Sequence, residues 1–369
     1  MLLFLTLAAC LVAYANGAND NFKGVATLYG SGTASYRGAI VWATVTTVAG
    51  ALTAAIISGK LVASFSGKGI VPDSFTHAPH FLTAVGLGAA ATALIATRFG
   101  LPVSTTHALL GGLMGAGLVA TQGHLSSTAL GKSFVLPLLL SPIIAMAGSR
   151  VAYPFLRLAR LRLGVEREMC LCVDLTPQPV AISSEGTAVC HHGGVALAVK
   201  QASECRTRYV GTVMGIDAQR VLDRVHYMSA GAVGFARGMN DAPKIVALLV
   251  ASRLIGLSLG LAVVATLMAL GGLLSARRVA ETMSRRITDM NHGQAFTANA
   301  VTASLVLAAS LWGLPVSTTH VSVGALAGIG AATGHARWKT LAAIVGAWVT
   351  TLPLAAGLAA AAYALARFW

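Results

Sequence analysis

Long apolar segments alternate with short polar loops along most of this chain, and one longer polar region separates them into two groups. The apolar segments lie at residues 1–28, 38–58, 81–98, 101–121 and 133–156, and then at 226–252, 254–274, 293–311, 314–333 and 340–363. A helix needs about 20 mostly apolar residues to cross a bilayer. The pattern therefore predicts an all-α polytopic membrane protein with a first membrane region at 1–156, a polar insert at 157–225 and a second membrane region at 226–369.

Composition and charge fit this class. Of the 369 residues, 56% are hydrophobic and only 10% are charged. The net charge of +14 is compatible with nucleic-acid binding, but most basic residues lie in loops between apolar segments, where Lys and Arg determine membrane topology. No Lys or Arg precedes Lys23, so the first segment lacks the charged start of a signal peptide. We expect this segment to be a membrane helix, and we expect no nucleic-acid partner.

An identical heptapeptide, Leu-Pro-Val-Ser-Thr-Thr-His, occurs at residues 101–107 and again at 314–320, each time directly after a glycine. An exact repeat of this length indicates an internal duplication. The peptide also predicts a helix start inside an apolar segment, because glycine ends a helix, proline suits the first helical position and hydroxyl groups cap free N–H groups. The N-terminus of a helix attracts anions, so each copy is a candidate anion-binding site.

A second motif is duplicated as well. Residues 14–23 and 235–244 share the pattern aromatic-Ala-x-Gly-x-Asn-Asp-x-x-Lys, and Asp20 and Asp241 are the only carboxylates within apolar segments. A carboxylate at mid-membrane costs about 2.5–3.5 kcal/mol and requires a cation, a partner or a proton. The nearby glycines, with Pro243, predict a helix break in each copy, where freed carbonyl groups are ligands for Na⁺. The alternative is structural: each Asp and the Lys three residues later neutralise each other as an ion pair.

Each membrane region holds an odd number of segments, five, so the two halves have opposite orientations in the bilayer. Such inverted repeats, with broken or re-entrant helices, are found in many secondary transporters. Cytoplasmic loops carry the excess of Lys and Arg. If the N-terminus lies outside, seventeen of the twenty-six basic residues fall in cytoplasmic loops and five fall outside. We predict a multi-pass protein of the cell (inner or plasma) membrane with both termini outside and the insert in the cytoplasm.

The insert contains short alternating stretches, which predict a small β-containing region. Its thiol and imidazole groups raise the possibility of a metal site; they belong to Cys170, Cys172, Cys190, His191, His192 and Cys205. Their spacing is not that of a standard zinc site, so we favour reduced cytoplasmic thiols over a metal centre.

Together, the Asn-Asp motif after a glycine and the Pro-x-Ser-Thr-Thr-His peptide, one of each in both halves, resemble the inorganic phosphate transporter family of the sodium-phosphate symporter type. The resemblance covers both membrane regions. It implies two inverted repeats, often in a homodimer, that carry phosphate with Na⁺ or H⁺. Lys23 departs from the commoner first-half pattern, in which a small or amide residue follows the Asp.

The resemblance also implies roles for individual residues. It assigns cation binding, with some substrate contact, to Asn19, Asp20, Asn240 and Asp241. It assigns the phosphate cradle to Ser104, Thr105, Thr106, Ser317, Thr318 and Thr319. We add Lys23 and Lys244 to the predicted substrate-binding residues. We expect His107 and His320 to hold a hydroxyl or backbone group in place, or to titrate with a coupled proton.

The predicted function is import of inorganic phosphate, coupled to Na⁺ or H⁺ and with no other cofactor, by alternating access between the two repeats. A sulfate permease of the same fold is the main alternative. An anion channel would not need the paired carboxylates. A membrane hydrolase would need one differentiated Ser–His–Asp site, whereas both halves carry the same residues and no Gly-x-Ser-x-Gly motif is present. We therefore predict that the chain is not an enzyme.

Overall fold

A computed structural model describes residues 1–57, 59–163, 166–168, 172–175, 195–198, 208–210, 212–213, 216–251 and 255–366. The chain divides into two compact units. One comprises Met1–Arg157 together with Leu222–Trp369, and the other comprises Leu158–Val221. The first unit therefore unites both predicted membrane regions.

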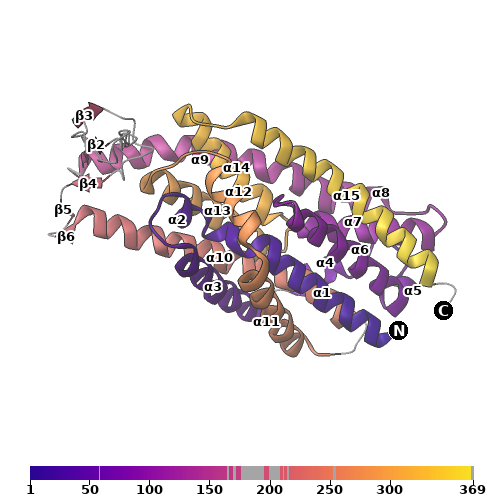
Figure 1. Cartoon of the computed structure of the whole chain (residues 1–369). Helices are drawn as coiled ribbons and strands as arrows, with labels where there is room; N and C mark the ends of the chain where they lie inside the picture. The colour runs from indigo at the N-terminus through magenta and orange to yellow at the C-terminus, as the bar shows by residue number, and fades with distance from the viewer. Residues whose placement is uncertain are drawn as a thin grey trace, which may run out of the picture. The chain divides into compact units, whose positions relative to one another are not determined.

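The named elements of the first membrane region are all helices (Figure 1). It contains α1 (Leu2–Asp20), the 3-10 helix η1 (Asn21–Gly24), α2 (Ala26–Gly30), α3 (Tyr36–Ile57), α4 (Gly59–Phe65), α5 (Asp73–Thr76), α6 (Pro79–Arg98), α7 (Thr105–Ala120), α8 (Ser127–Leu130), the π-helix η2 (Gly131–Val135) and α9 (Leu136–Arg162).

The second region contains α10 (Ala218–Ala251), α11 (Leu257–Ser275), α12 (Arg277–Arg285), α13 (His292–Trp312), α14 (Thr318–Thr333) and α15 (Trp338–Ala366). Among the described residues, seven helical segments are long and apolar enough to cross a membrane: Leu2–Gly24, Tyr36–Ile57, Pro79–Arg98, Leu136–Arg162, Leu257–Ser275, His292–Trp312 and Trp338–Ala366. The remaining three predicted segments contain α10, with 34 residues, and the shorter α7 and α14, with 16 residues each. The prediction of an all-α polytopic membrane protein is confirmed.

Each heptapeptide lies between two helices and starts the second one. The glycines before the peptides, Gly100 and Gly313, adopt the left-handed φ values of 68° and 72° that favour glycine, and so end α6 and α13. Ser104 and Ser317 are the caps of α7 and α14, and each Oγ accepts a hydrogen bond from the backbone N–H three residues later at 3.2 Å. The proline was expected at the first helical position. It instead lies two residues before the cap, in the extended segment that precedes the helix.

The helix break predicted at the first Asn-Asp motif is present, but the one predicted at the second is not. The first helix ends at Asp20 and continues as the 3-10 helix η1. In the second repeat, α10 runs unbroken through Asp241 with Pro243 inside it. A proline in a helix removes a single N–H donor, and membrane helices tolerate this loss when neighbouring groups satisfy the freed carbonyl.

Helices of one repeat pack closely against helices of the other. The first Asn-Asp helix, α1, contacts α11, and a Cβ atom on Gly17 would lie 2.0 Å from the carbonyl oxygen of Met268. In the equivalent contact between α10 and α3, a Cβ on Gly238 would lie 2.1 Å from the carbonyl oxygen of Thr47. The glycine of each Asn-Asp motif therefore lets the two repeats approach at the depth of the buried carboxylates.

The second unit contains short antiparallel strand pairs in its described residues. The pairs join β1 (Glu166–Glu168) with β4 (Arg208–Val210), β2 (Cys172–Leu175) with β3 (Val195–Ala198), and β5 (Thr212–Val213) with β6 (Ile216–Asp217). Of the insert's predicted thiol and imidazole groups, Cys172 belongs to β2, and the other five residues lie outside the described part of the chain.

Candidate functional site

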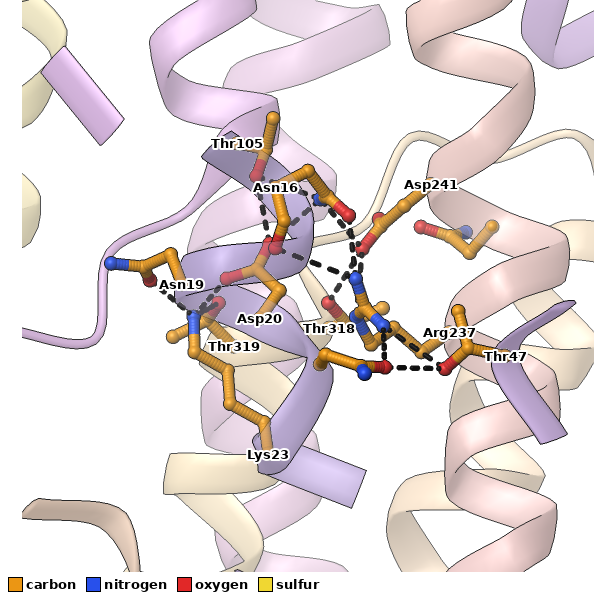
Figure 2. A network of polar contacts seen from close by, with 12 residues as sticks. Asn16, Asn19, Asp20, Lys23, Thr47, Thr105, Arg237, Asp241, Thr318 and Thr319 are labelled. Atoms are coloured by element: carbon orange, nitrogen blue, oxygen red, sulfur yellow. Dashed lines mark hydrogen bonds and ion pairs between the residues drawn. The ribbon is translucent and has the colours of Figure 1, made fainter. Parts of the chain in front are cut away.

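The first Asn-Asp motif places the Lys23 ammonium within a set of four oxygen atoms (Figure 2). Lys23 Nζ donates to Asn19 Oδ1 at 2.9 Å and to Asp20 Oδ1, both of its own motif. It also donates to the Val103 carbonyl oxygen at 2.7 Å and to Thr319 Oγ1 at 2.6 Å. Val103 and Thr319 belong to different heptapeptides, so this lysine connects the two repeats.

The second motif builds the same arrangement from equivalent residues. Lys244 Nζ donates to Asn240 Oδ1 and, at 3.2 Å, to Asp241 Oδ1. It also donates to the Val316 carbonyl oxygen at 2.7 Å and to Thr106 Oγ1 at 2.8 Å. The two lysine sites thus match, atom for atom, under exchange of the repeats.

The asparagine beside each carboxylate is held by its own repeat. Asn19 Nδ2 donates to Thr97 Oγ1 at 2.9 Å, and Asn240 Nδ2 donates to Ser310 Oγ at the same distance. These hydroxyl groups lie near the ends of α6 and α13. Because each hydroxyl accepts a hydrogen bond from the amide nitrogen, the amide oxygen of each asparagine is directed at the lysine.

The two heptapeptides meet directly. Thr106 Oγ1 lies 3.3 Å from the Val316 carbonyl oxygen, and Thr319 Oγ1 lies 2.9 Å from that of Val103. In Figure 1, the hairpin of α6 and α7 and the hairpin of α13 and α14 approach each other from opposite ends of the membrane unit. The starts of α7 and α14 therefore converge on one region inside the protein.

The histidines of the heptapeptides lie at this junction but outside the network of carboxylates and lysines. The rings of His107 and His320 are in edge contact, with centroids 4.4 Å apart. On its other side, His320 lies 3.8 Å from the ring of Trp348 in α15. The indole N–H of Trp348 donates to the Pro102 carbonyl oxygen at 3.1 Å, so this tryptophan contacts both heptapeptides.

The other threonine of each heptapeptide contacts a carboxylate. Thr105 Oγ1 donates to Asp20 Oδ2 at 2.7 Å, and Thr318 Oγ1 lies 3.3 Å from Asp241 Oδ2. The amide of Asn16 bridges the two carboxylates, with Nδ2 at 2.9 Å from Asp20 Oδ2 and 3.4 Å from Asp241 Oδ2. Both carboxylates therefore direct one oxygen toward a lysine and the other toward a shared centre.

Arg237 breaks the symmetry of this centre. It occupies the position that Asn16 holds in the first repeat, and its Nη2 donates to Asn16 Oδ1 at 2.5 Å. Its Nη1 lies 3.0 Å from both Asn21 Oδ1 and Thr47 Oγ1. Its Nε lies 3.7 Å from Asp241 Oδ2 and has no hydrogen-bond acceptor among the residues that the structure describes. One N–H of a buried guanidinium is thus available beside the shared centre.

The charge of this cluster is unusual for a membrane interior. Among the described residues, the only buried Asp, Glu, Lys and Arg side chains are Asp20, Lys23, Arg237, Asp241 and Lys244, each at most 3% exposed. When all five are ionised, they carry three positive and two negative charges, a net charge of +1. Charges in such surroundings are costly and mark functional sites.

The structure brings the acidic, amide, lysine and threonine residues predicted from the two motifs into one buried cluster. Ser104 and Ser317 are buried as the caps of α7 and α14, and the two histidines lie outside the network of carboxylates and lysines. Sequence reasoning did not select Asn16, Asn21, Thr47 and Arg237. A signal for the arginine was present, because Arg237 is a basic residue inside an apolar segment.

Comparisons with known proteins show the family to which the chain belongs. Residues 16–359 match the phosphate transporter family. A protein of Pyrococcus abyssi named as a phosphate permease is 31% identical, with 96% of this chain and 95% of the relative covered. The chain belongs to the phosphate transporter family. This family membership identifies it as a transporter in a membrane and not as an enzyme.

Two further relatives extend the comparison. The chloroplastic inorganic phosphate transporter 2-1 of Arabidopsis thaliana is 29% identical, with 94% of this chain and 69% of the relative covered. A solved structure described as the sodium-dependent phosphate transporter superposes with a TM-score of 0.79 at 24% identity, covering 100% of this chain and 99% of the other. This likeness shows that the two proteins share a fold over the full chain.

Proposed function

We propose that this member of the phosphate transporter family imports inorganic phosphate through the cell (inner or plasma) membrane, coupled to a gradient of Na⁺ or H⁺. The observation that carries the proposal is the meeting of two helix starts from opposite repeats around one buried cluster of charges. Each helix start offers backbone N–H groups and hydroxyl groups to an anion.

The proposed anion site lies between the starts of α7 and α14. Its hydroxyl groups come from Ser104, Thr105, Thr106, Ser317, Thr318 and Thr319, and its guanidinium from Arg237. The net charge of +1 favours entry of an anion, because a monovalent oxyanion would neutralise the cluster. Asn19, Asp20, Asn240 and Asp241 hold cations at its edge, and His107 and His320 keep the two helix starts in place.

Phosphate fits this site better than sulfate, the main alternative. Asp20 Oδ2 and Asp241 Oδ2 are hydrogen-bond acceptors directed at the shared centre, where Asn16 contacts both. Dihydrogen phosphate has O–H groups that donate to carboxylates, whereas sulfate is fully ionised at neutral pH and has none. Sulfate would therefore meet repulsion from both carboxylates.

Transport requires the cluster to open, since its side chains are almost fully buried. In alternating access, the tips of the α6–α7 and α13–α14 hairpins would separate so that the site opens first to one side of the membrane and then to the other. The distribution of basic residues supports an orientation with both termini outside. The homodimer implied by the family resemblance remains a prediction.

Uptake into proteoliposomes tests the proposal. Purified protein should accumulate labelled phosphate when a Na⁺ or proton gradient is imposed, and a tenfold excess of unlabelled sulfate should leave most of this uptake intact. Concentrative uptake of sulfate in preference to phosphate would contradict the assignment of substrate. Equilibration without accumulation under either gradient would indicate a channel.

A further inference from the structure

We propose that Lys23 and Lys244 are tethered substitutes for two sodium ions, so that transport by this chain does not use Na⁺. The inference rests on the proposed transport of an anion, and it narrows the choice of coupling ion. It follows from the oxygen atoms that surround each lysine and from the net charge of the buried cluster.

The oxygen atoms around each lysine form a ligand set suited to Na⁺. Each set consists of one carboxylate oxygen, one amide oxygen, one main-chain carbonyl oxygen and one threonine hydroxyl. Hard cations are bound by oxygen ligands of these kinds, and transporters bind Na⁺ with carbonyl groups at interrupted helices. The ligand chemistry of both sites therefore fits the ion named for the solved relative.

The space within each set, however, is already filled. An ammonium group has three N–H donors, and in each site it faces four oxygen atoms, so every donor has an acceptor and the ammonium occupies the centre of the set. Six of the eight nitrogen–oxygen separations lie between 2.6 Å, from Lys23 Nζ to Thr319 Oγ1, and 3.2 Å, from Lys244 Nζ to Asp241 Oδ1. A sodium ion could enter only if the ammonium left.

The charge balance leads to the same conclusion. With both lysines in place, the cluster already carries more positive than negative charge. Adding one Na⁺ beside each lysine would bring like charges together in a region of low dielectric, which is strongly unfavourable. The lysines also link the two repeats, as a bound ion would. Lys23 contacts Thr319 and Lys244 contacts Thr106, each in the opposite repeat.

Thermal unfolding in detergent tests the inference without any transport. The protein is heated in NaCl, KCl or choline chloride at equal ionic strength. For the wild type we expect the same midpoint in all three salts. In Lys23→Ala and Lys244→Ala, singly and together, the vacated oxygen set should bind Na⁺ and raise the midpoint by about 1–3 °C in NaCl alone.

Two control variants distinguish the binding of Na⁺ from stabilisation by any group that fills the site. Lys23→Met occupies the same volume without a charge and leaves no room for an ion, so its midpoint should not respond to Na⁺. Lys68→Ala changes an exposed lysine and should behave as the wild type does. A Na⁺-specific shift in the wild type, or no Na⁺ response in any folded Ala variant, would overturn the inference.

Uptake provides the second readout. In proteoliposomes, a Na⁺ gradient at constant pH should leave phosphate uptake by the wild type unchanged relative to choline, whereas a proton gradient should drive it. If Na⁺ stimulates uptake severalfold, the inference is wrong and the proposed function stands. If no phosphate is taken up under either gradient, the proposed function is wrong and the unfolding experiment still decides whether the lysines replace Na⁺. Should the Ala variants fail to fold, the wild-type measurements alone decide.

Discussion

At the scale of single residues, the two buried carboxylates are equivalent in sequence but not in charge balance. Asp241 lies 3.2 Å from the Lys244 ammonium and 3.7 Å from the Arg237 guanidinium, whereas in the described part of the chain Asp20 pairs only with Lys23. Removing one partner of a buried pair costs about 3–5 kcal/mol, since a charge remains without compensation.

We therefore expect Asp20→Asn and Asp241→Asn to abolish phosphate uptake, and Asp241→Asn to lower the thermal midpoint by more than Asp20→Asn. Uptake assays and thermal unfolding of the purified variants measure the two effects. Normal uptake with unchanged ion dependence in either variant would rule out its carboxylate as part of the site. Equal losses of stability would show that Arg237 does not depend on Asp241.

The threonines that contact these carboxylates give a second residue-scale prediction. Thr105→Val and Thr318→Val keep the side-chain shape and delete the hydroxyl group. A hydrogen bond to a charged group contributes about 1.5–3 kcal/mol, so each variant should raise the phosphate concentration for half-maximal uptake about ten- to hundredfold.

Thr266→Val is the matched control, because this threonine is exposed and its hydroxyl donates only to its own helix, to the Ala262 carbonyl oxygen at 2.9 Å. It should leave uptake unchanged. If only Thr105→Val or only Thr318→Val weakens uptake, the anion site draws its hydroxyl groups from one repeat.

Sequence reasoning found the symmetric residues of the site and missed the asymmetric ones, for a physical reason. Duplication marks Asp20 and Asp241, and each lysine follows its aspartate by one helical turn, so their pairing is local. Arg237 and Asn16 are 221 positions apart and come together only when the two repeats pack against each other. No local pattern encodes that contact.

At the scale of elements, the glycines of the Asn-Asp motifs set how closely α1 packs on α11 and α10 on α3. Gly17→Ala and Gly238→Ala would place a methyl group about 2 Å from a backbone oxygen of the other repeat. We expect each to destabilise the protein by about 1–3 kcal/mol, visible as a lower thermal midpoint and less folded protein in the membrane.

Gly346→Ala is the control for this prediction. Gly346 lies within α15, and a Cβ atom there would meet no atom within 4 Å. Alanine favours helix over glycine by about 0.5–1 kcal/mol, so this variant should be as stable as the wild type or slightly more stable. Unchanged stability of Gly17→Ala and Gly238→Ala would mean that the two repeats can shift apart at no cost.

Element boundaries were less predictable than element identity. The apolar segments and the helix starts within the heptapeptides follow from composition and from glycine at positive φ. The continuity of α10 through Pro243 does not, because it depends on whether surrounding groups replace one lost backbone hydrogen bond. Proline therefore lies in the extended segment before a helix in each heptapeptide and inside a helix in α10.

At the scale of the whole membrane unit, the inverted repeat fixes which loops share a side. The two hairpins meet at their tips, so the loop at the base of α6 and α7 and the loops at the base of α13 and α14 lie at opposite ends of the unit. Exposed lysines mark both ends: Lys68 precedes α6, and Lys339 follows α14.

The distribution of basic residues predicts that Lys68 lies outside and that Lys339 and the insert lie in the cytoplasm. On a cysteine-free background, Lys68→Cys should react with a membrane-impermeant thiol reagent in intact cells. Lys339→Cys and Ser184→Cys should react only after the membrane is permeabilised. Each variant should first retain phosphate uptake, which shows that it is inserted correctly. The reverse labelling pattern would invert the orientation while leaving the repeat intact, whereas labelling of Lys68→Cys and Lys339→Cys from the same side would contradict the inverted repeat itself.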